Sequence, residues 1–342
     1  MYQQSSFYKN IFWFAKKTLL LGFVLLVFSS CFKEDDKISP HSKGNNIEQS
    51  IVLGSNYETQ HYFSLTNQMS MSSNLVSSWD LAFSSSPENC YVMLNSALMM
   101  QVACTHDTDF RKTYSPEDFD FIFDASSGLL DSNAIGLWYT TANDSVNSKR
   151  EVYLLDRGKD ENYNALGYKK LQLDFVQNQY QIKISNLDNT EEQVYTITKN
   201  ETFNYQFLSF EQGLLNIEPA KDSWSLKFSK YSTILYTDDG DEYPYLVTGV
   251  LLNPYQTEVA VDTSDYSTIS IADTSDYLFT KQADAIGYNW KFYNFDEGIY
   301  SIVPNLCYII RNQDGYYYKL RFVNFYSSEG IKGTIKLEYQ KL

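Results

Sequence analysis

The chain has 342 residues and a formal charge of −15, since 42 acidic side chains outnumber 27 Lys and Arg. This acidity argues against a nucleic-acid partner, which would need clustered basic side chains, and 3 His leave little room for imidazole catalysis or a multi-histidine metal site. The hydrophobic share of 43% suffices for a buried core, and 29 Tyr with 22 Phe favour strands over helices.

The first segment, residues 1–30, has the pattern of a secretory signal peptide. It carries Lys9, Lys16 and Lys17 without an acidic residue, and an apolar run follows over residues 19–28. The run is shorter than the roughly 20 apolar residues that cross a bilayer. Two serines and Cys31 follow it, in a pattern that resembles a bacterial lipobox. We therefore predict lipidation of Cys31 and attachment to a membrane through the lipid only. The alternative is an ordinary signal peptide with an incidental cysteine.

A tether follows over residues 31–48. Lys33 and the acidic run at 34–36 resemble a lipoprotein export signal of some Gram-negative bacteria. That resemblance implies attachment to the outer membrane, with the protein facing the exterior. The simpler interpretation is a solvated, flexible linker, because the segment is rich in Lys, Asp, Ser, Asn and Gly.

The rest of the chain is predicted to consist of two tandem repeats. HYFSL at 61–65 matches QFLSF at 206–210, and at the same spacing WDLAFS at 79–84 matches WSLKFS at 224–229. Four further features then recur in the same order in both halves. They are AIG with a Trp soon after it, an apolar run, a Lys-Leu pair and a closing strand. The order of these landmarks places the repeats at 49–188 and 189–342.

Within each repeat the hydrophobic pattern alternates with a period of two, which is typical of strands. At 57–65, for example, His61, Phe63 and Leu65 fall on one face, so His61 is expected to be a core side chain. Turn-forming DG pairs at 239–240 and 314–315 separate such runs, and no long segment has a helical period. The prediction is an all-β fold of two tandem domains.

Four landmarks follow one another in a fixed order along residues 50–342. They are Tyr57 with YFS at 62–64, WDLAF at 79–83, YPYLVTGVLLN at 243–253, and a closing segment over 308–322 with GTI at 333–335. In this order they resemble the HmuY-like haem-binding lipoprotein family. The resemblance implies an all-β fold and a role in taking haem from a host or the environment and passing it to an outer-membrane receptor.

Haem sites of that family use two axial side chains, His or sometimes Met. By the resemblance, the second position falls near Asn294 in the second repeat and near Thr141 or Ala142 in the first, and none of these is a good iron ligand. Haem could still bind through Tyr, or through the first repeat. The candidate haem ligands there are Met99, Met100 and His106. The alternatives are that the methionines fill a core and that the histidine lies in a solvated loop.

The sequence assigns no metal ligand set. Cys90 and Cys104 could form one disulfide in an oxidising compartment, while Cys307, in an apolar run, is expected to be a buried thiol. Acidic stretches at 238–242, 262–266 and 273–277 are expected to close turns rather than to bind Ca²⁺.

Enzyme motifs are absent from the sequence, which has no HExxH, no GxSxG and no phosphate-binding glycine loop. A carboxylate pair for glycoside hydrolysis would leave no signature in the spacing of residues. We predict a surface lipoprotein that is not an enzyme and that binds haem or a haem-carrying protein. The alternative is a surface protein that binds a protein or a glycan without haem, through its surplus of Tyr and Trp.

Overall fold

Short antiparallel strands build residues 43–142 and 145–342, the part of the chain that a computed structural model describes. The predicted signal peptide, Cys31 and most of the tether lie outside these residues. Within them the helices are 3-10 helices of three to five residues, and none is long and apolar enough to cross a membrane. The predicted all-β fold is confirmed.

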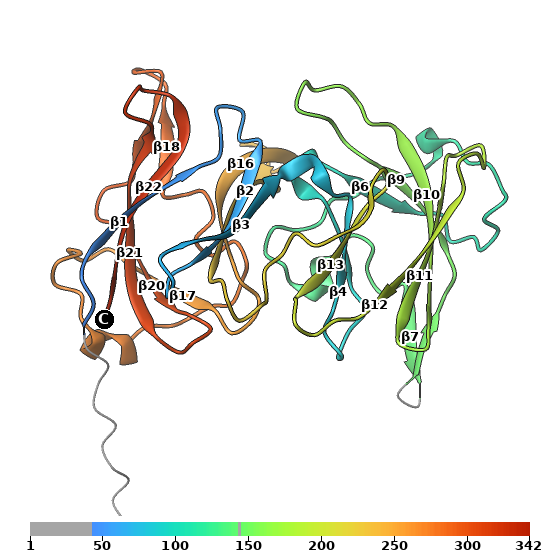
Figure 1. The fold of residues 1–342 in the computed structure, drawn as a ribbon. Helices are drawn as coiled ribbons and strands as arrows, with labels where there is room; N and C mark the ends of the chain where they lie inside the picture. The colour runs from blue at the N-terminus through green and yellow to red at the C-terminus, as the bar shows by residue number, and fades with distance from the viewer. Residues whose placement is uncertain (1–42, 143–144) are drawn as a thin grey trace, which may run out of the picture. The chain divides into compact units, whose positions relative to one another are not determined.

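The first lobe is one continuous stretch of chain, from β4 to β14 (Figure 1). Its two sheets have the strand orders β12-β11-β10-β9-β6 and β14-β13-β4-β5, and β7 with β8 forms a separate hairpin. The strands are β4 (Leu81–Ser84), β5 (Val92–Leu94), β6 (Gln101–Cys104), β7 (Tyr139–Ala142), β8 (Ser145–Ser148), β9 (Val152–Asp156), β10 (Tyr168–Val176), β11 (Gln179–Ser185), β12 (Gln193–Thr198), β13 (Tyr205–Ser209) and β14 (Gly213–Leu215).

The second lobe combines the two ends of the described chain. Its sheets have the orders β1-β22-β21-β20-β17 and β16-β15-β2-β3, and β18 with β19 forms the hairpin. In Figure 1 the blue strand β1 lies beside the red strand β22, to which it is paired. The strands are β1 (Ile47–Val52), β2 (Thr59–Ser64), β3 (Met69–Leu75), β15 (Leu226–Tyr236), β16 (Glu242–Leu252), β17 (Glu258–Asp262), β18 (Lys291–Asn294), β19 (Ile299–Ile302), β20 (Cys307–Arg311), β21 (Tyr317–Tyr326) and β22 (Lys332–Lys341).

The two lobes share one strand order. The strands β4–β14 of the first lobe can be matched one to one, in order, with β15–β22 followed by β1–β3 of the second. With this matching, each sheet of the first lobe has the same strand order as one sheet of the second. Each predicted repeat therefore gives its first three strands to the lobe of the other, so that β2 pairs with β15 and β13 pairs with β4. The division expected at residues 188 and 189 falls between β11 and β12, which pair with each other. The repeat boundaries stay a prediction.

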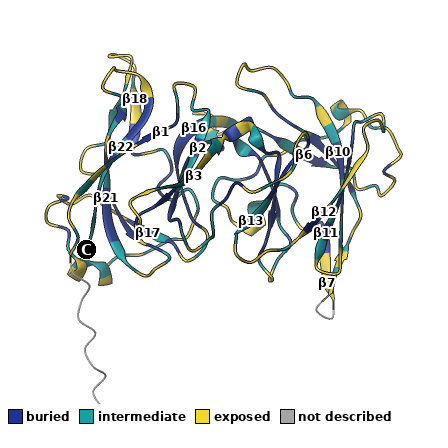
Figure 2. Ribbon diagram, viewed as in Figure 1, coloured by how far each residue is buried: buried dark blue, intermediate teal, exposed yellow. Residues whose placement is uncertain are grey.

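Alternating burial along the strands fills a separate core in each lobe. In β11 the buried side chains of Tyr180, Ile182 and Ile184 alternate with polar, partly exposed ones. They pack in a cluster with Trp138, and the corresponding cluster of the second lobe contains Trp290. In Figure 2 dark blue is concentrated in the strands and yellow in the loops, with teal in both.

A buried lysine occupies the same place in each five-stranded sheet. Lys170 of β10 donates from Nζ to the carbonyl oxygen of Phe110 at 2.7 Å, and Lys319 of β21 donates to that of Tyr266 at 2.6 Å. Each ammonium group thereby holds the loop that follows β6 or β17. The Lys-Leu pair recurs in the sequence because both lobes use this contact.

Aromatic side chains join the lobes. Tyr62 meets Trp224 edge-on with ring centroids 4.9 Å apart, and Trp79 meets Phe207 in the same way at 5.1 Å. All four rings belong to one buried cluster, to which each lobe gives one pair. Lys227 crosses between the lobes, with its Nζ 5.6 Å from the centroid of the Trp79 ring.

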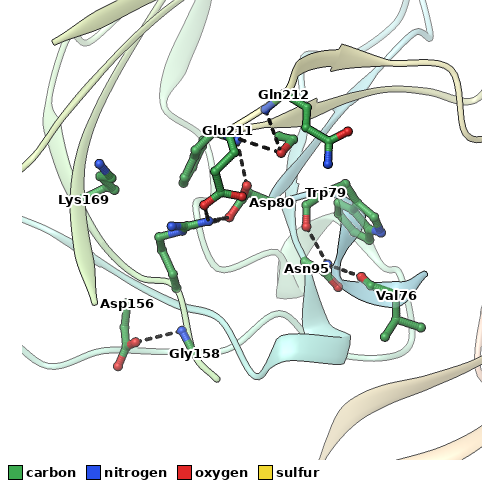
Figure 3. A network of polar contacts seen from close by, with 12 residues as sticks. Val76, Trp79, Asp80, Asn95, Asp156, Gly158, Lys169, Glu211 and Gln212 are labelled. Atoms are coloured by element: carbon green, nitrogen blue, oxygen red, sulfur yellow. Dashed lines mark hydrogen bonds and ion pairs between the residues drawn. The ribbon is translucent and has the colours of Figure 1, made fainter. Parts of the chain in front are cut away.

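The first lobe also contains a buried ion pair, which Figure 3 shows from close by. Arg157 donates from Nε to Asp80 Oδ1 at 3.0 Å, while the other oxygen of Asp80 accepts the backbone N–H of Phe210 at 2.8 Å. A second carboxylate, Glu211, binds the same guanidinium at 2.8 Å. Burial raises the pKa of Asp80 despite the arginine. The second lobe has Ser225 at the matching position, so this pair belongs to one lobe only.

Candidate ligand-binding surface

The predicted methionine ligands lie at the edge of the first-lobe core. Met100 is 1% exposed and belongs to that core, which agrees with the alternative that it fills space. Met99 is partly exposed and ends a 3-10 turn with a left-handed backbone, at φ 59°. Both stay candidates for an iron ligand, but neither lies beside the third candidate. The strand β6 stands between them and His106, and at about 3.3 Å per residue it separates their backbones by more than about 10 Å.

His106 follows β6 and its side chain is 80% exposed. Its Nδ1 lies 3.1 Å from Glu151 Oε1 and 3.5 Å from Cys104 Sγ. The loop position expected for this histidine is therefore observed, with Cys104 two positions before it and with Glu151, which sequence spacing did not indicate.

The disulfide considered between Cys90 and Cys104 is not formed. Cys90 is buried, Cys104 is partly exposed, and both are free thiols, as is the buried Cys307. Cys90 packs in the first-lobe core, where its carbonyl oxygen accepts the indole N–H of Trp138 at 2.7 Å. Cys104 stands at the end of β6 and packs against the same core from its edge, without a bond to Cys90.

Other polar residues noted in the sequence have structural roles. Both ring nitrogens of His61 are occupied, with Nε2 2.9 Å from the carbonyl oxygen of Val52 and Nδ1 3.2 Å from Ser70 Oγ. The acidic stretch at 238–242 closes the hairpin between β15 and β16 through a backbone bond from Thr237 to Asp241. His41 lies outside the described residues.

The positions that the family resemblance assigns to an axial ligand lie on the two small hairpins. Thr141 and Ala142 are exposed on β7. Asn294 ends β18, and its Oδ1 accepts the backbone N–H groups of Asp296 and Glu297 at 3.0 and 3.3 Å. Its side chain is thus committed to a turn. The tryptophans near these hairpins, Trp138 and Trp290, are each 1% exposed, so a filled core and not an opening surrounds them.

An aromatic surface surrounds the β18–β19 hairpin. Phe295 is 88% exposed, and its ring centroid lies 5.1 Å from that of Tyr293. Tyr293 pairs across the hairpin with Tyr300 at 5.2 Å, and Tyr300 packs on Phe325 at 5.2 Å. In Figure 2 part of the ribbon around β18 is yellow, which marks exposed residues. We use the name aromatic surface for Tyr57, Tyr245, Tyr293, Phe295, Tyr300 and Tyr326.

Hydroxyl groups gather on this surface. The backbone N–H of Tyr300 donates to the Tyr326 hydroxyl at 2.7 Å. Burial, and then the hydroxyls of Tyr245, Tyr326 and Tyr293, raise the pKa of Tyr300, which shows that β16, β18 and β21 bring these groups together. The hydroxyl of Tyr300 therefore stays protonated near neutral pH unless a cation stabilises its phenolate.

Two lysines border the same surface. Lys332 Nζ lies 5.4 Å from the centroid of Tyr57. Lys291 is buried beside Trp290 and Tyr300, with Nζ 4.4 and 5.7 Å from their ring centroids. Its ammonium donates to the carbonyl oxygen of Thr248, and burial lowers its pKa to about 7. A carboxylate that reached this edge would meet the exposed ammonium of Lys332.

The hairpin of the first lobe has a different surface. Its strands read YTTA and SVNS, and apart from the buried Tyr139 they carry no aromatic side chain. The aromatic surface is thus specific to the second lobe, although the hairpins occupy matching places in the strand order.

A cleft of about 310 Å³ opens elsewhere, against β5 and the loop after β16. This volume is near the lower limit for small-molecule sites. Asp124 lies in its wall and accepts the backbone N–H of Leu94 at 2.7 Å and of Ala134 at 2.7 Å, and burial raises its pKa to about 6. Its oxygens are thereby used by the fold. The lining also includes Tyr91, Met93, Tyr205, Lys221 and Tyr255.

The family model described as HmuY protein matches residues 56–339. The chain belongs to the HmuY family. The resemblance drawn from the order of landmarks is therefore confirmed. Those landmarks are now placed: WDLAF leads into β4, YPYLVTGVLLN forms β16, and the closing segment forms β20 and β21.

Solved structures of similar proteins are distant in sequence. Apo PinO from Porphyromonas gingivitis is 7% identical, with a TM-score of 0.28 over 87% of this chain and 97% of its own. The apo HmuY analog of Tannerella forsythia is 9% identical, with a TM-score of 0.23 over 51% of this chain and 96% of its own. Such low scores add nothing to the family assignment. No curated protein matches the sequence.

Sequence reasoning missed both groupings that the fold brings together. The aromatic surface had one signal, the run FYNF at 292–295, but its partners come from β16, β19 and β21. Of the two neighbours of His106, Cys104 lies two positions before it in the sequence, whereas Glu151 had no signal because it lies 45 positions further along the chain.

Proposed function

We propose that this HmuY-family protein is a binding protein, not an enzyme, that captures haem on the aromatic surface of the second lobe. The observation that carries the proposal is the exposed group of rings and hydroxyls around Asn294, the position that the family resemblance assigns to an axial ligand. The protein does this as a lipoprotein anchored through Cys31 at the outer membrane of a Gram-negative bacterium and facing the exterior.

The chemistry of the surface suits a flat aromatic ligand with carboxylates. Phe295 offers a ring face on which a porphyrin can stack, and such a contact between rings contributes roughly 0.5–1.5 kcal/mol beyond the buried area. A Tyr oxygen is an established haem ligand. Tyr293 is 43% exposed and precedes Asn294, so its hydroxyl is the proposed iron ligand, and Lys332 is the proposed partner of a propionate.

A titration of the purified protein with haemin, followed by absorbance, tests the proposal. We expect a shifted Soret band with the parent protein, an altered band with Tyr293→Phe, and roughly tenfold weaker binding with Phe295→Ala, which loses about 1.4 kcal/mol. Tyr168→Phe is the matched control, because Tyr168 on β10 of the first lobe is 40% exposed.

The outcomes decide whether haem is the ligand and which lobe binds it. No Soret shift with the parent protein rejects haem capture and leaves the binding of a protein or a glycan, which an array probed with the same protein tests. A shift that survives in Tyr293→Phe and Phe295→Ala but is lost in Met99→Ala, Met100→Ala or His106→Ala moves the site to the first lobe. Equal effects of Tyr168→Phe and Tyr293→Phe reject the aromatic surface.

A further inference from the structure

We propose that Cys104, His106 and Glu151 of the first lobe form a binding site for a single Zn²⁺ ion. Their candidate ligand atoms, Sγ, Nδ1 and a carboxylate oxygen, all lie within 4.8 Å of one another. The site is separate from the aromatic surface, and the inference does not depend on haem capture.

The strands hold the three residues in place without an ion. Cys104 ends β6, and Glu151 directly precedes β9, to which β6 is paired. The backbone of Thr105 donates to the carbonyl oxygen of Val152 at 3.0 Å, and its hydroxyl donates to the same oxygen at 2.8 Å. The left-handed backbone of His106, at φ 55°, then turns its ring back toward both neighbours. A site on paired strands loses little flexibility on binding.

The distances fit tetrahedral zinc. Bonds of about 2.3 Å to sulfur, 2.05 Å to nitrogen and 2.1 Å to oxygen place sulfur and nitrogen about 3.6 Å apart, and nitrogen and oxygen about 3.4 Å apart. The structure has 3.5 Å between Cys104 Sγ and His106 Nδ1, and 3.1 Å between that nitrogen and Glu151 Oε1. These two distances differ from the tetrahedral values by no more than a few tenths of an ångström, and the third pair, Cys104 Sγ and the Glu151 oxygen, lies within 4.8 Å. The exposed side of His106 leaves the fourth position open to water.

The same nitrogen, His106 Nδ1, contacts both Cys104 and Glu151. This arrangement favours a metal ion between the three side chains over a shared proton. His106 Nδ1 carries one hydrogen at most, so it cannot both donate fully to Glu151 and accept from the thiol of Cys104. A metal ion accepts lone pairs from all three atoms at once. Thiolate and imidazole together with one carboxylate are ligands typical of Zn²⁺ rather than of Ca²⁺ or Mg²⁺.

The second lobe supplies an internal comparison. By strand register, Val261, Thr263 and Leu306 occupy the matching positions, because Val261 pairs with Tyr308 as Cys104 pairs with Tyr153. Two of the three side chains are apolar, so this lobe has no equivalent ligand set. The expected stoichiometry is therefore one ion per chain.

A titration of metal-free protein with Zn²⁺, in competition with a chromogenic chelator, tests the site. We expect one ion per chain and at least roughly tenfold weaker binding in each of Cys104→Ser, His106→Ala and Glu151→Gln. The matched controls are Cys307→Ser, which removes another thiol, and Glu192→Gln, whose carboxylate is 27% exposed against 20% for Glu151. Both controls should bind as the parent protein does.

Co²⁺ provides a readout that a loss of fold would not imitate. With Co²⁺ the parent protein and Glu151→Gln should show a thiolate-to-cobalt charge-transfer band, which Cys104→Ser should lack while its circular dichroism is unchanged. Absence of saturable Zn²⁺ binding, equal affinities in ligand and control variants, or a charge-transfer band that persists in Cys104→Ser would each overturn the proposal.

Discussion

The junction between the lobes contains a carboxylate whose ionisation should weaken the fold. Glu218 is 5% exposed and accepts hydrogen bonds from Asn204 Nδ2 at 2.6 Å and from the backbone N–H of Tyr205 at 2.9 Å. Burial raises its pKa from 4.5 to about 7, although these bonds and the charge of Lys227 oppose the shift. The perturbation we consider is Glu218→Gln, which removes the titration and keeps the shape.

The sign and size follow from linkage. Because the carboxyl binds its proton more tightly in the folded state, the folded protein carries more protons than the unfolded one between pH 4.5 and about 7. The free energy of unfolding therefore falls as pH rises through this window. With these two pKa values, linkage predicts that the free energy of unfolding falls by about 2 kcal/mol between about pH 5 and about pH 7. Lys227, whose pKa burial lowers to about 8, titrates above the window.

Urea unfolding of parent and variant across this range measures the effect. Glutamine has one oxygen where Glu218 uses two as acceptors, so Glu218→Gln should also lose stability at every pH. The diagnostic quantity is the change with pH in the stability difference between parent and variant. We expect that difference to shift by about 2 kcal/mol in favour of the variant on going from about pH 5 to about pH 7. Asp124, with its pKa raised to about 6, titrates in both proteins and cancels. A constant difference would refute the reasoning, as would an equal shift in Glu201→Gln, an exposed control.

Two further predictions concern a buried charge and the predicted anchor. Arg157→Met should lower the free energy of unfolding by about 3–5 kcal/mol, because it leaves Asp80 buried without its cation, whereas Arg150→Met, which breaks a pair with a 66% exposed arginine, should cost less than about 1 kcal/mol. Thermal or urea unfolding checks both, and equal losses would contradict the expected role of burial. Cys31→Ser should move the protein from the membrane fraction to the soluble fraction of its native cell and remove incorporation of labelled lipid, and continued labelling would reject lipidation at Cys31.

The sequence predicts the composition of the lobes better than their assembly. Strand periodicity and the order of landmarks are local properties, and they correctly indicate an all-β chain of the HmuY family. The exchange of β1–β3 and β12–β14 between the predicted repeats leaves no trace in that order, because HYFSL and QFLSF keep their spacing whichever lobe they join. Strand partners are set by side-chain packing at the junction, as with Tyr62 against Trp224, and this depends on contacts far apart in sequence.

The matching strand order of the lobes shows where they have diverged. Their cores keep equivalent features, including the Trp138 and Trp290 clusters and the lysines that hold the loops. Their surfaces do not, since the β18–β19 hairpin is aromatic where β7–β8 is polar, and the start of β9 faces Cys104 and His106 where that of β20 faces valine and threonine. Packing constrains the core residues of both lobes alike, whereas an exposed hairpin or a strand end is free to change. The differences therefore fall on the positions to which the haem and zinc sites are assigned, one in each lobe.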